Sequence, residues 1–591
     1  MSPELWPERA TLLDHSMENN SLTRGTVRFG SFELDLRAGE LRKADVKIKL
    51  QEQPLQILAM LLEHPGQVVT REELRNRLWA SDTFVDFDHS LNKAINKLRE
   101  ALGDSADNPH FVETLAKRGY RFLDDPRRTP GKIQSLLVLP LENLSRDPEQ
   151  EYFADGLTEE LNSKLARISA LRVLSRTTAM HYKGVRKPLP ELARELQVEG
   201  VVEGTVMRSG DRIRISAQLI HAPTDTHLWA ESYERDLRDV LGLQAEVAGA
   251  IAREVAVKVT PHEQAQLARS HQVDPEAYEA YLKGRFHWNK RTIEGLKKGG
   301  EYFQQAIEKD PGYAAAYAGL ADSAAILGWW GFVPPDQGCG RAKAAALKAL
   351  EIDDTLADAH ASLGFSLLHY DFAFLAAERE FQRALELNPR NPTAVQWHAA
   401  CLTTMARPDE AVNEILRAVQ LDPLSLVIHW TAGALLYHAR QYDRAIAQSR
   451  RCLELEPSFP PPRWTIAIAL VKKGATESAV AEMEDVVRLT GENTLYLATL
   501  AHCYGASGRR DDALSILQQL QDLSKQRYVT AYWPAVIYAS LNEKDETFRW
   551  LDIAYQERSA WMVYTKIFPW FDNLRSDPRF DDLLRRMNFP P

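Results

Sequence analysis

Small and apolar residues recur every 34 positions in the C-terminal half of the chain, and prolines share this spacing. Two antiparallel helices in each unit need small residues where their backbones approach, and a proline ends the second helix. The pattern therefore predicts stacked helical pairs, each covering its neighbour's apolar face. The three sets are Ala377, Ala411, Ala445, Ala479 and Ala513; Ala384, Ala418, Cys452, Val486 and Leu520; and Pro389, Pro423 and Pro457.

This unit, with alanine and proline at these places, resembles the tetratricopeptide (TPR) repeat. The resemblance is strong over about 355–523, with an earlier repeat expected near Tyr302 to Leu327. The insertion Gly328 to Pro335 (GWWGFVPP) breaks the register. The resemblance implies that residues 274–591 form an α-helical superhelix with a C-terminal cap, which binds an unknown protein partner in a concave groove.

Three tryptophans (Trp397, Trp430 and Trp464) fall within these repeats, and we expect core packing for them, with ligand contact as the alternative. Four cysteines are too few for a disulfide scaffold, and none forms a C-x-x-C pair. We expect them to be small apolar fillers in a reducing compartment. They are Cys339, Cys401, Cys452 and Cys503.

The N-terminal part alternates short strands with helical patterns. Period-2 alternation predicts strands, and an apolar run followed by a His-Pro-Gly turn predicts a helix. Thr70 with Glu73 three positions later is a capping-box signature for the next helix. The predicted elements are strands at 27–29, 32–35, 46–50 and 68–70 and helices at 54–62 and 71–78.

A further helix is predicted from about Ser90 to Leu102, with one apolar stripe. The opposite face carries amides and ammonium groups, which suit base edges in a major groove: Asn binds adenine bidentately, and Lys donates to guanine. Arg99, further along, suits a phosphate. The alternative is a plain solvated helix face. The stripe consists of Leu91, Ala94, Ile95, Leu98 and Leu102, and the polar face of Asn92, Lys93, Asn96 and Lys97.

A predicted hairpin downstream favours DNA binding over the solvated face. Its strands, 111–115 and 120–122, enclose the basic tip Ala116-Lys117-Arg118-Gly119. Such a wing can reach the sugar-phosphate backbone or the adjacent minor groove. We therefore add four wing residues to the candidate site: Lys117, Arg118, Tyr120 and Arg121.

Residues 27–124 together resemble the OmpR/PhoB-type winged helix-turn-helix. The resemblance is carried by Val69 to Leu74 (VTREEL), Ser90 to Arg99 (SLNKAINKLR) and Arg118 to Phe122 (RGYRF). It implies that the third helix enters the major groove of double-stranded DNA and that the wing touches the flanking groove. It also implies that the loop Trp79 to Asp88 contacts RNA polymerase and that the protein binds tandem half-sites as a homodimer.

Residues 133–258 mix strands and helices, which predicts an α/β domain with a mixed sheet. Their sequences YFADGLT (152–158), VEG (202–204) and HLWA (227–230) resemble the TolB amino-terminal-like module. The resemblance implies a structural or sensing spacer, and ligand binding stays open. The predicted strands are 135–139, 171–174, 200–207, 212–221 and 227–233, and the helices are 158–168, which follows a break at Gly156, 189–196 and 239–257.

The bulk composition limits the remaining possibilities. The chain has 591 residues and a net charge of -10, so DNA binding requires a local basic patch. We expect a flexible tail at 1–26, a linker at 125–132, no signal peptide and no membrane span, hence a cytoplasmic protein.

Enzymatic signatures are missing from the sequence: there is no phosphate-binding loop and no H-E-x-x-H. His221, His227 and Asp225 would make a poor metal site, and turn residues at the surface are the alternative. We expect no enzyme, no cofactor and no metal.

The sequence thus predicts a multidomain α+β protein: a winged helix, a middle α/β domain and a TPR superhelix. Only 26 residues precede the winged helix, so we expect a one-component transcription regulator without a receiver domain. The alternative is a TPR scaffold whose winged helix does not read DNA.

Overall fold

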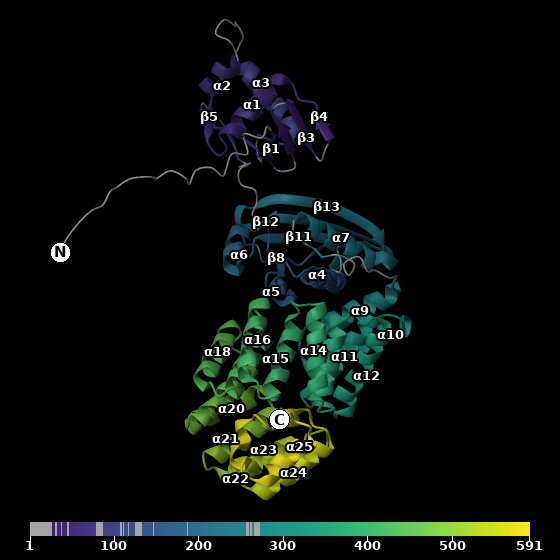
Figure 1. Cartoon of the computed structure of the whole chain (residues 1–591), viewed down its shortest axis with the longest axis vertical. Helices are drawn as coiled ribbons and strands as arrows, with labels where there is room; N and C mark the ends of the chain where they lie inside the picture. Colours follow the sequence, from purple (N-terminus) through teal and green to yellow (C-terminus); the bar gives the residue numbers. More distant parts are fainter. Residues whose placement is uncertain are drawn as a thin grey trace, which may run out of the picture. The chain divides into compact units, whose positions relative to one another are not determined.

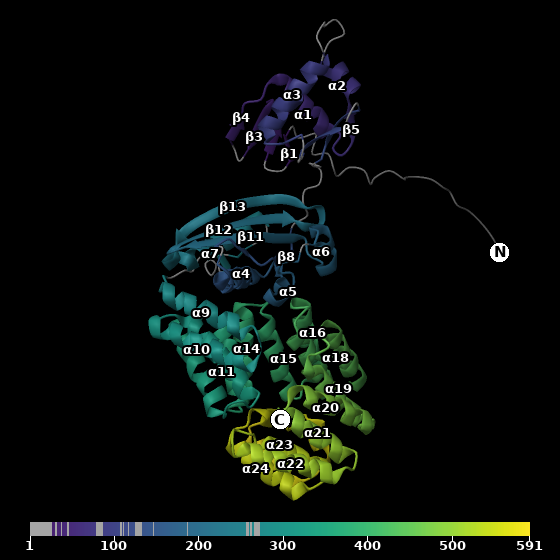
Figure 2. The same cartoon turned by 180° about the vertical axis from the view of Figure 1, so that it is seen from behind.

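In the computed structural model the chain divides into two compact units, Met1–Lys132 and Ile133–Pro591. Figures 1 and 2 show them coloured along the sequence from two opposite sides. The structure describes residues 26–29, 32–36, 38–43, 46–78, 87–106, 109, 111–115, 118–123, 133–145, 147–185, 187–255, 259–260, 263–264 and 272–590.

The described residues of the first unit form two small antiparallel sheets and three helices around one core. Its first sheet is a meander in the order β1-β2-β3-β4, and its second has the order β5-β7-β6. The predicted strands and helices are present, and β3 was not predicted. The elements are β1 (Thr26–Phe29), β2 (Phe32–Asp35), β3 (Glu40–Lys43), β4 (Val46–Ile48), α1 (Glu52–Glu63), β5 (Val68–Thr70), α2 (Arg71–Leu78), α3 (Phe87–Leu102), β6 (Val112–Leu115) and β7 (Gly119–Phe122).

The capping box predicted at the start of α2 is confirmed. The backbone N–H of Thr70 donates to Oε2 of Glu73 at 2.7 Å, and the N–H of Glu73 donates to the Thr70 hydroxyl at 3.2 Å. These bonds lower the pKa of Glu73 and keep its carboxylate charged. They fix the point where the chain leaves β5 and enters the helix.

The second unit begins with a mixed sheet, as predicted. Strands β10, β8 and β11 run parallel, while β12 and β13 continue antiparallel. The elements are β8 (Ser135–Val138), β9 (Glu142–Asn143), α4 (Glu151–Ala166), β10 (Arg172–Val173), α5 (Arg176–His181), α6 (Leu189–Leu196), β11 (Gly200–Ser209), β12 (Arg212–His221), β13 (Thr226–Asp236) and α7 (Val240–Glu254).

The prediction that a break at Gly156 precedes a helix from Thr158 is wrong. Helix α4 begins at Glu151 and passes through Gly156. A Cβ atom at this glycine would lie 2.6 Å from Cδ2 of Leu282. The glycine therefore makes room for a packed neighbour. The short helix α5, capped by the Ser175 hydroxyl, was also not predicted.

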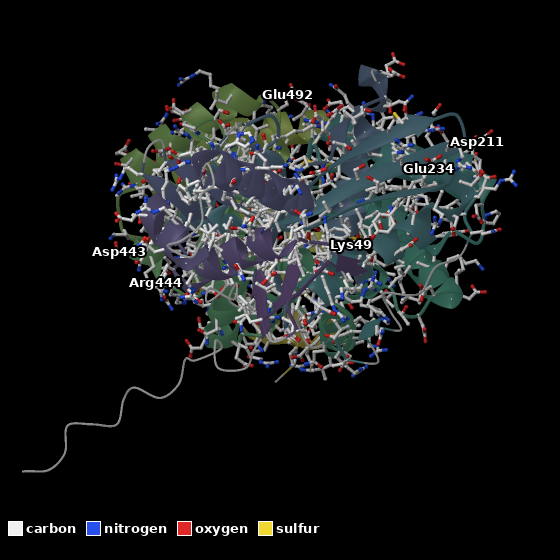
Figure 3. All side chains as sticks on the ribbon, turned by 90° about the horizontal axis from the view of Figure 1, so that it is seen from above. Lys49, Asp211, Glu234, Asp443, Arg444 and Glu492 are labelled. Carbon is white, nitrogen blue, oxygen red and sulfur yellow. The ribbon has the colours of Figure 1, made fainter. Side chains whose placement is uncertain are left out.

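Strand β12 shows why the long hairpin is stable. Its apolar residues alternate with polar ones, so Ile213, Ile215 and Leu219 are buried in the core beneath α4 and α7. On the exposed side lies Glu234 of β13, which is labelled in Figure 3. It accepts hydrogen bonds from Arg212 and Arg214. One face of this part of the sheet is thus apolar and covered, and the other is charged.

The remainder of the second unit is an array of paired antiparallel helices (Figure 2). The helices are α9 (Pro275–Trp288), α10 (Ile293–Lys309), α11 (Ala314–Trp329), α12 (Arg341–Ile352), α13 (Ala357–His369), α14 (Phe374–Leu387), α15 (Pro392–Thr404), α16 (Pro408–Leu421), α17 (Leu426–His438), α18 (Tyr442–Leu455), α19 (Pro460–Lys472), α20 (Thr476–Thr490), α21 (Thr494–Ala506), α22 (Arg510–Ser524), α23 (Tyr532–Ser540), α24 (Lys544–Gln556) and α25 (Pro578–Arg586), with 3-10 turns at Ala560–Tyr564 and Pro569–Leu574.

The 34-residue pattern has the predicted structural basis. All five alanines from Ala377 to Ala513 are buried on the second helix of their pairs, and Pro389, Pro423 and Pro457 each lie two positions after such a helix. A feature that was not predicted recurs at the same spacing. The turn inside each pair contains a residue with positive φ: Phe372, Ala406, Arg440, Gly474, Gly508 and Asn542.

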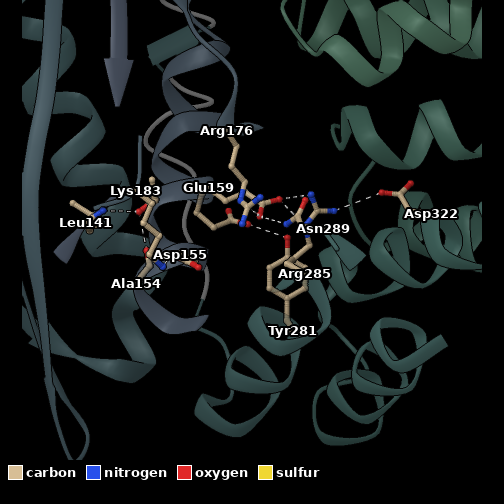
Figure 4. A network of polar contacts seen from close by, with 12 residues as sticks. Leu141, Ala154, Asp155, Glu159, Arg176, Lys183, Tyr281, Arg285, Asn289 and Asp322 are labelled. Carbon is tan, nitrogen blue, oxygen red and sulfur yellow. Dashed lines mark hydrogen bonds and ion pairs between the residues drawn. The ribbon is translucent and has the colours of Figure 1, made fainter. Parts of the chain in front are cut away.

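Buried charges join the array to the mixed-sheet domain (Figure 4). The carboxylate of Glu159 on α4 accepts a 2.8 Å hydrogen bond from Nε of Arg285 and another from the Asn289 amide. It also lies 3.1 Å from Nε of Arg176. These cations hold the pKa of Glu159 below its usual range even though burial opposes them. The ion pairs therefore fix α9 against α4.

All four cysteines are buried and unpaired, as predicted for apolar fillers. Trp397, Trp430 and Trp464 are also largely buried. In the described part of the chain no helix is long and apolar enough to cross a membrane. Nor do three or more His, Cys, Asp or Glu side chains gather there as a metal site would require.

Candidate DNA-binding surface

Helix α3 presents the polar face that its sequence predicts. It begins at Phe87, three residues earlier than expected, and buries the predicted stripe against α1 and both sheets. Asn92, Lys93 and Asn96 are exposed, and Lys97 is half-buried. The helix therefore has one anchored side and one side open to a ligand, as entry into a major groove requires.

Two residues on this open side have unengaged side chains. Within the described residues, neither Lys93 nor Asn96 makes a side-chain hydrogen bond or ion pair. Lys97 differs, because its Nζ donates to Oε1 of Gln51 at 2.6 Å. On the open side of α3, Lys93 and Asn96 are therefore free, whereas Lys97 is engaged.

Arg71, which was not among the predicted site residues, connects α2, α3 and the wing. Its guanidinium donates to Oδ1 of Asp88 at 2.8 Å, to Oδ1 of Asn92 at 3.2 Å and to the Tyr120 hydroxyl at 3.2 Å. The Tyr120 hydroxyl donates in turn to Oδ1 of Asn92 at 2.9 Å. The Tyr120 ring is buried, so Tyr120 reaches this surface only through its hydroxyl.

Arg99 does not face outward, so the prediction of a phosphate contact is wrong. Only 6% of the residue is exposed. Its Nη2 donates to the carbonyl oxygen of Val112 at 2.6 Å and to the Thr114 hydroxyl at 2.8 Å. Position 99 follows Ile95 by four, which places it at the edge of the apolar stripe. Arg99 therefore supports strand β6 of the wing.

The wing itself is formed by β6 and β7, with Arg118 exposed at its tip. Gly119 lies so close to β5 that a Cβ atom there would be 2.1 Å from the carbonyl oxygen of Val69. Arg121 is half-exposed, and its Nη2 lies 2.6 Å from Oε2 of Glu113. Arg118 is therefore the freer cation of the two.

Lys117 and residues 79–86 of the Trp79–Asp88 loop lie outside the described residues. The predicted phosphate contact of Lys117 and the predicted polymerase contact of this loop therefore stay predictions.

The N-terminal domain matches a known family. The family described as "Transcriptional regulatory protein, C terminal" matches residues 45–122. These residues include α3 and the whole wing. The chain therefore carries an OmpR/PhoB-type DNA-binding domain at its N-terminus, as predicted.

Curated relatives extend the match to other parts of the chain. The "Putative adenylate cyclase 3" of Rhizobium meliloti (strain 1021) is 36% identical over 246 residues, which are 41% of this chain and 42% of that protein. The "Transcriptional regulator HilA" of Salmonella typhimurium is 22% identical over 396 residues, or 66% of this chain and 69% of that protein. A "Cholera toxin homolog transcriptional activator" of Vibrio parahaemolyticus is 42% identical over 76 residues, which are 13% of this chain and 26% of that protein. The chain thus spans less than half the length of the first of these relatives.

A solved TPR protein from Parabacteroides merdae is 14% identical, covers 53% of this chain and 99% of its own, and has a TM-score of 0.30. The assignment of the array as TPR repeats therefore depends on its own helix pairs and spacing. The resemblance of residues 133–258 to the TolB module stays a prediction.

Proposed function

We propose that the protein is a one-component, sequence-specific DNA-binding regulator of transcription whose TPR array receives a signal or recruits a protein. The observation that carries the proposal is the pair of unengaged side chains, Lys93 and Asn96, on the open side of α3. The match of residues 45–122 to a family of transcriptional regulatory proteins supports it.

The roles of the site residues follow from their surroundings. Lys93 and Asn96 contact base edges in the major groove, and Arg118 with Lys117 and Arg121 contacts the sugar-phosphate backbone beside it. Asn92 and Tyr120 hold α3 and the wing at a fixed separation. Lys97 reaches DNA after releasing Gln51.

Selection of binding sites by the full chain from a random pool of duplex DNA tests this proposal. We expect one enriched sequence and a steep loss of affinity with salt, because neutralised phosphates release counterions. On that sequence, alanine at Lys93 or Asn96 removes about 1–3 kcal/mol of discrimination at one base pair. Alanine at Arg118 weakens binding to all sequences and lowers the salt slope by about 1.

Arg450→Ala is the matched control, because it removes an exposed cation from the repeat array. It leaves site preference and salt slope unchanged. Unchanged binding in the Lys93, Asn96 and Arg118 variants would contradict DNA reading and favour the protein-interaction scaffold.

Further features belong to the same proposal. The protein works in the cytoplasm, binds tandem half-sites as a dimer, contacts RNA polymerase through the Trp79–Asp88 loop and is no enzyme. Because one relative is named as an adenylate cyclase, the absence of enzymatic activity is tested directly by an adenylate cyclase assay. Formation of cyclic AMP from ATP by the purified chain would contradict it.

A further inference from the structure

A cavity of about 550 Å³ lies inside the repeat array. The first helices of successive pairs line it, from α13 through α15, α17, α19 and α21. Protein sites for small organic molecules have about this volume, and they are mostly apolar with a few polar groups. The dimensions therefore suit a small molecule better than a folded partner.

Tryptophans dominate the wall of the cavity. The insertion Gly328–Pro335, which interrupts the repeat register, supplies Trp329, Trp330 and Phe332 to it. The Trp330 ring stacks on Trp430 with centroids 5.7 Å apart, and Trp329 stacks in the same way on Trp561 at 4.9 Å. Both insertion tryptophans are only half-buried. Their exposed parts offer apolar surface to a ligand.

One cation on the cavity wall, Arg291, has no side-chain hydrogen bond or ion pair within the described residues. Its guanidinium lies over the Trp288 ring, 3.5 Å from the centroid. The Trp288 ring covers one face of the guanidinium, and the residue stays exposed beside the cavity.

We propose that this cavity binds a small amphipathic monoanion, with an apolar, preferably aromatic, body against the tryptophans and one acid group on Arg291. A guanidinium that has no ion-pair partner and lies beside an apolar cavity attracts an acid group, because a charge-assisted hydrogen bond is stronger than a neutral one. Glu294 also lines the cavity. A second acid group on the ligand would meet this like charge, which favours a single one.

The test uses two fluorescent probes with the same carbon framework. 8-Anilinonaphthalene-1-sulfonate carries one negative charge, and N-phenyl-1-naphthylamine carries none. Both are titrated into the full chain and its Arg291→Gln variant. We expect the variant to bind the sulfonate about tenfold more weakly, as loss of a charge-assisted hydrogen bond predicts. Its affinity for the neutral probe changes less than twofold.

Three further variants isolate the site. Arg291→Lys retains most of the sulfonate binding, since it keeps the charge. Ala400→Phe fills the cavity and weakens both probes, whereas Arg450→Gln, on the outer helix α18, weakens neither. Equal weakening of both probes by Arg291→Gln would overturn the proposal, because Arg291 would then serve the fold alone. Unchanged sulfonate affinity in that variant would also overturn it.

Discussion

The hydroxyl of Tyr120 donates a 2.9 Å hydrogen bond to Oδ1 of Asn92, and this contact joins the wing to the exposed face of α3. The two residues are 28 positions apart in the sequence. Arg71 donates to both partners, so three elements meet at one point. The separation of α3 and the wing, which decides how both fit a DNA duplex, is therefore set by polar side chains.

Tyr120→Phe tests this role. The variant keeps the buried ring and removes the hydroxyl, so we expect a loss of about 1 kcal/mol in stability of the N-terminal domain. DNA affinity falls as well, because Asn92 and Arg71 lose a shared partner. Thermal unfolding and DNA titration of the full chain measure both effects. The control is Tyr317→Phe in the repeat array, and equal DNA affinity of the two variants would contradict the role.

Arg99→Met distinguishes a structural arginine from a phosphate ligand. The variant leaves the Val112 carbonyl and the Thr114 hydroxyl without their donor. Loss of a charged, buried partner costs about 1–3 kcal/mol, so the melting temperature of the N-terminal domain falls. Lys93→Met, which removes an exposed cation from the same helix, leaves that temperature unchanged. An Arg99→Met protein of normal stability with a reduced salt slope in DNA binding would instead restore the phosphate contact.

Local signals explain why most of this domain was predictable. The capping box at Thr70 and the apolar stripe of α3 involve residues at most a few helical turns apart, and both are confirmed. Arg99 was predicted to contact a phosphate, although its position four residues after Ile95 places it at the edge of the buried stripe. A long side chain at the edge of an apolar stripe can turn inward and donate a hydrogen bond to a buried carbonyl that would otherwise lack a donor. Here that carbonyl belongs to Val112.

The remaining contacts depend on distant parts of the chain. Arg285 and Glu159 are 126 positions apart, and no periodic pattern links them. Gly156 illustrates the same limit, since the sequence shows a helix-breaking residue while the structure uses the space that it leaves for Leu282. The repeats were predictable because the same contact recurs every 34 residues.

Ala406→Gly tests the turn that recurs within the repeats. Ala406 is exposed and has a φ of 61°, a conformation that costs an L-residue roughly 1–2 kcal/mol. Glycine removes this strain but gains entropy in the unfolded chain, so we expect a net gain of up to about 1 kcal/mol. The melting temperature of the array therefore rises.

The matched control is the reverse change at the equivalent position, Gly474→Ala. Nothing lies within 4 Å of a Cβ atom at Gly474, so only backbone strain acts there. The melting temperature of this variant falls. If both variants shifted it in the same direction, strain at the left-handed turn could not be the cause.

The last prediction concerns Asp322, which accepts a hydrogen bond from the Ser362 hydroxyl and lies 3.6 Å from Nη1 of Arg285. Burial and the negative charge of Asp358 raise the pKa of Asp322 to about 7. Between the unfolded pKa near 4 and this value, the folded state holds a proton that the unfolded state has released. The contribution of Asp322 to stability therefore decreases as pH rises through this range, by at most about 1.4 kcal/mol per pH unit.

Asp322→Asn removes this titration while keeping an acceptor for Ser362. Between pH 5 and pH 8, we expect the melting temperature of the wild-type array to fall further than that of the variant. Comparing the two proteins cancels the titration of other groups, provided that they keep their environments. Parallel curves for both proteins over this range would mean that Asp322 stays ionised in the folded state, held by Arg285 against the cost of its burial.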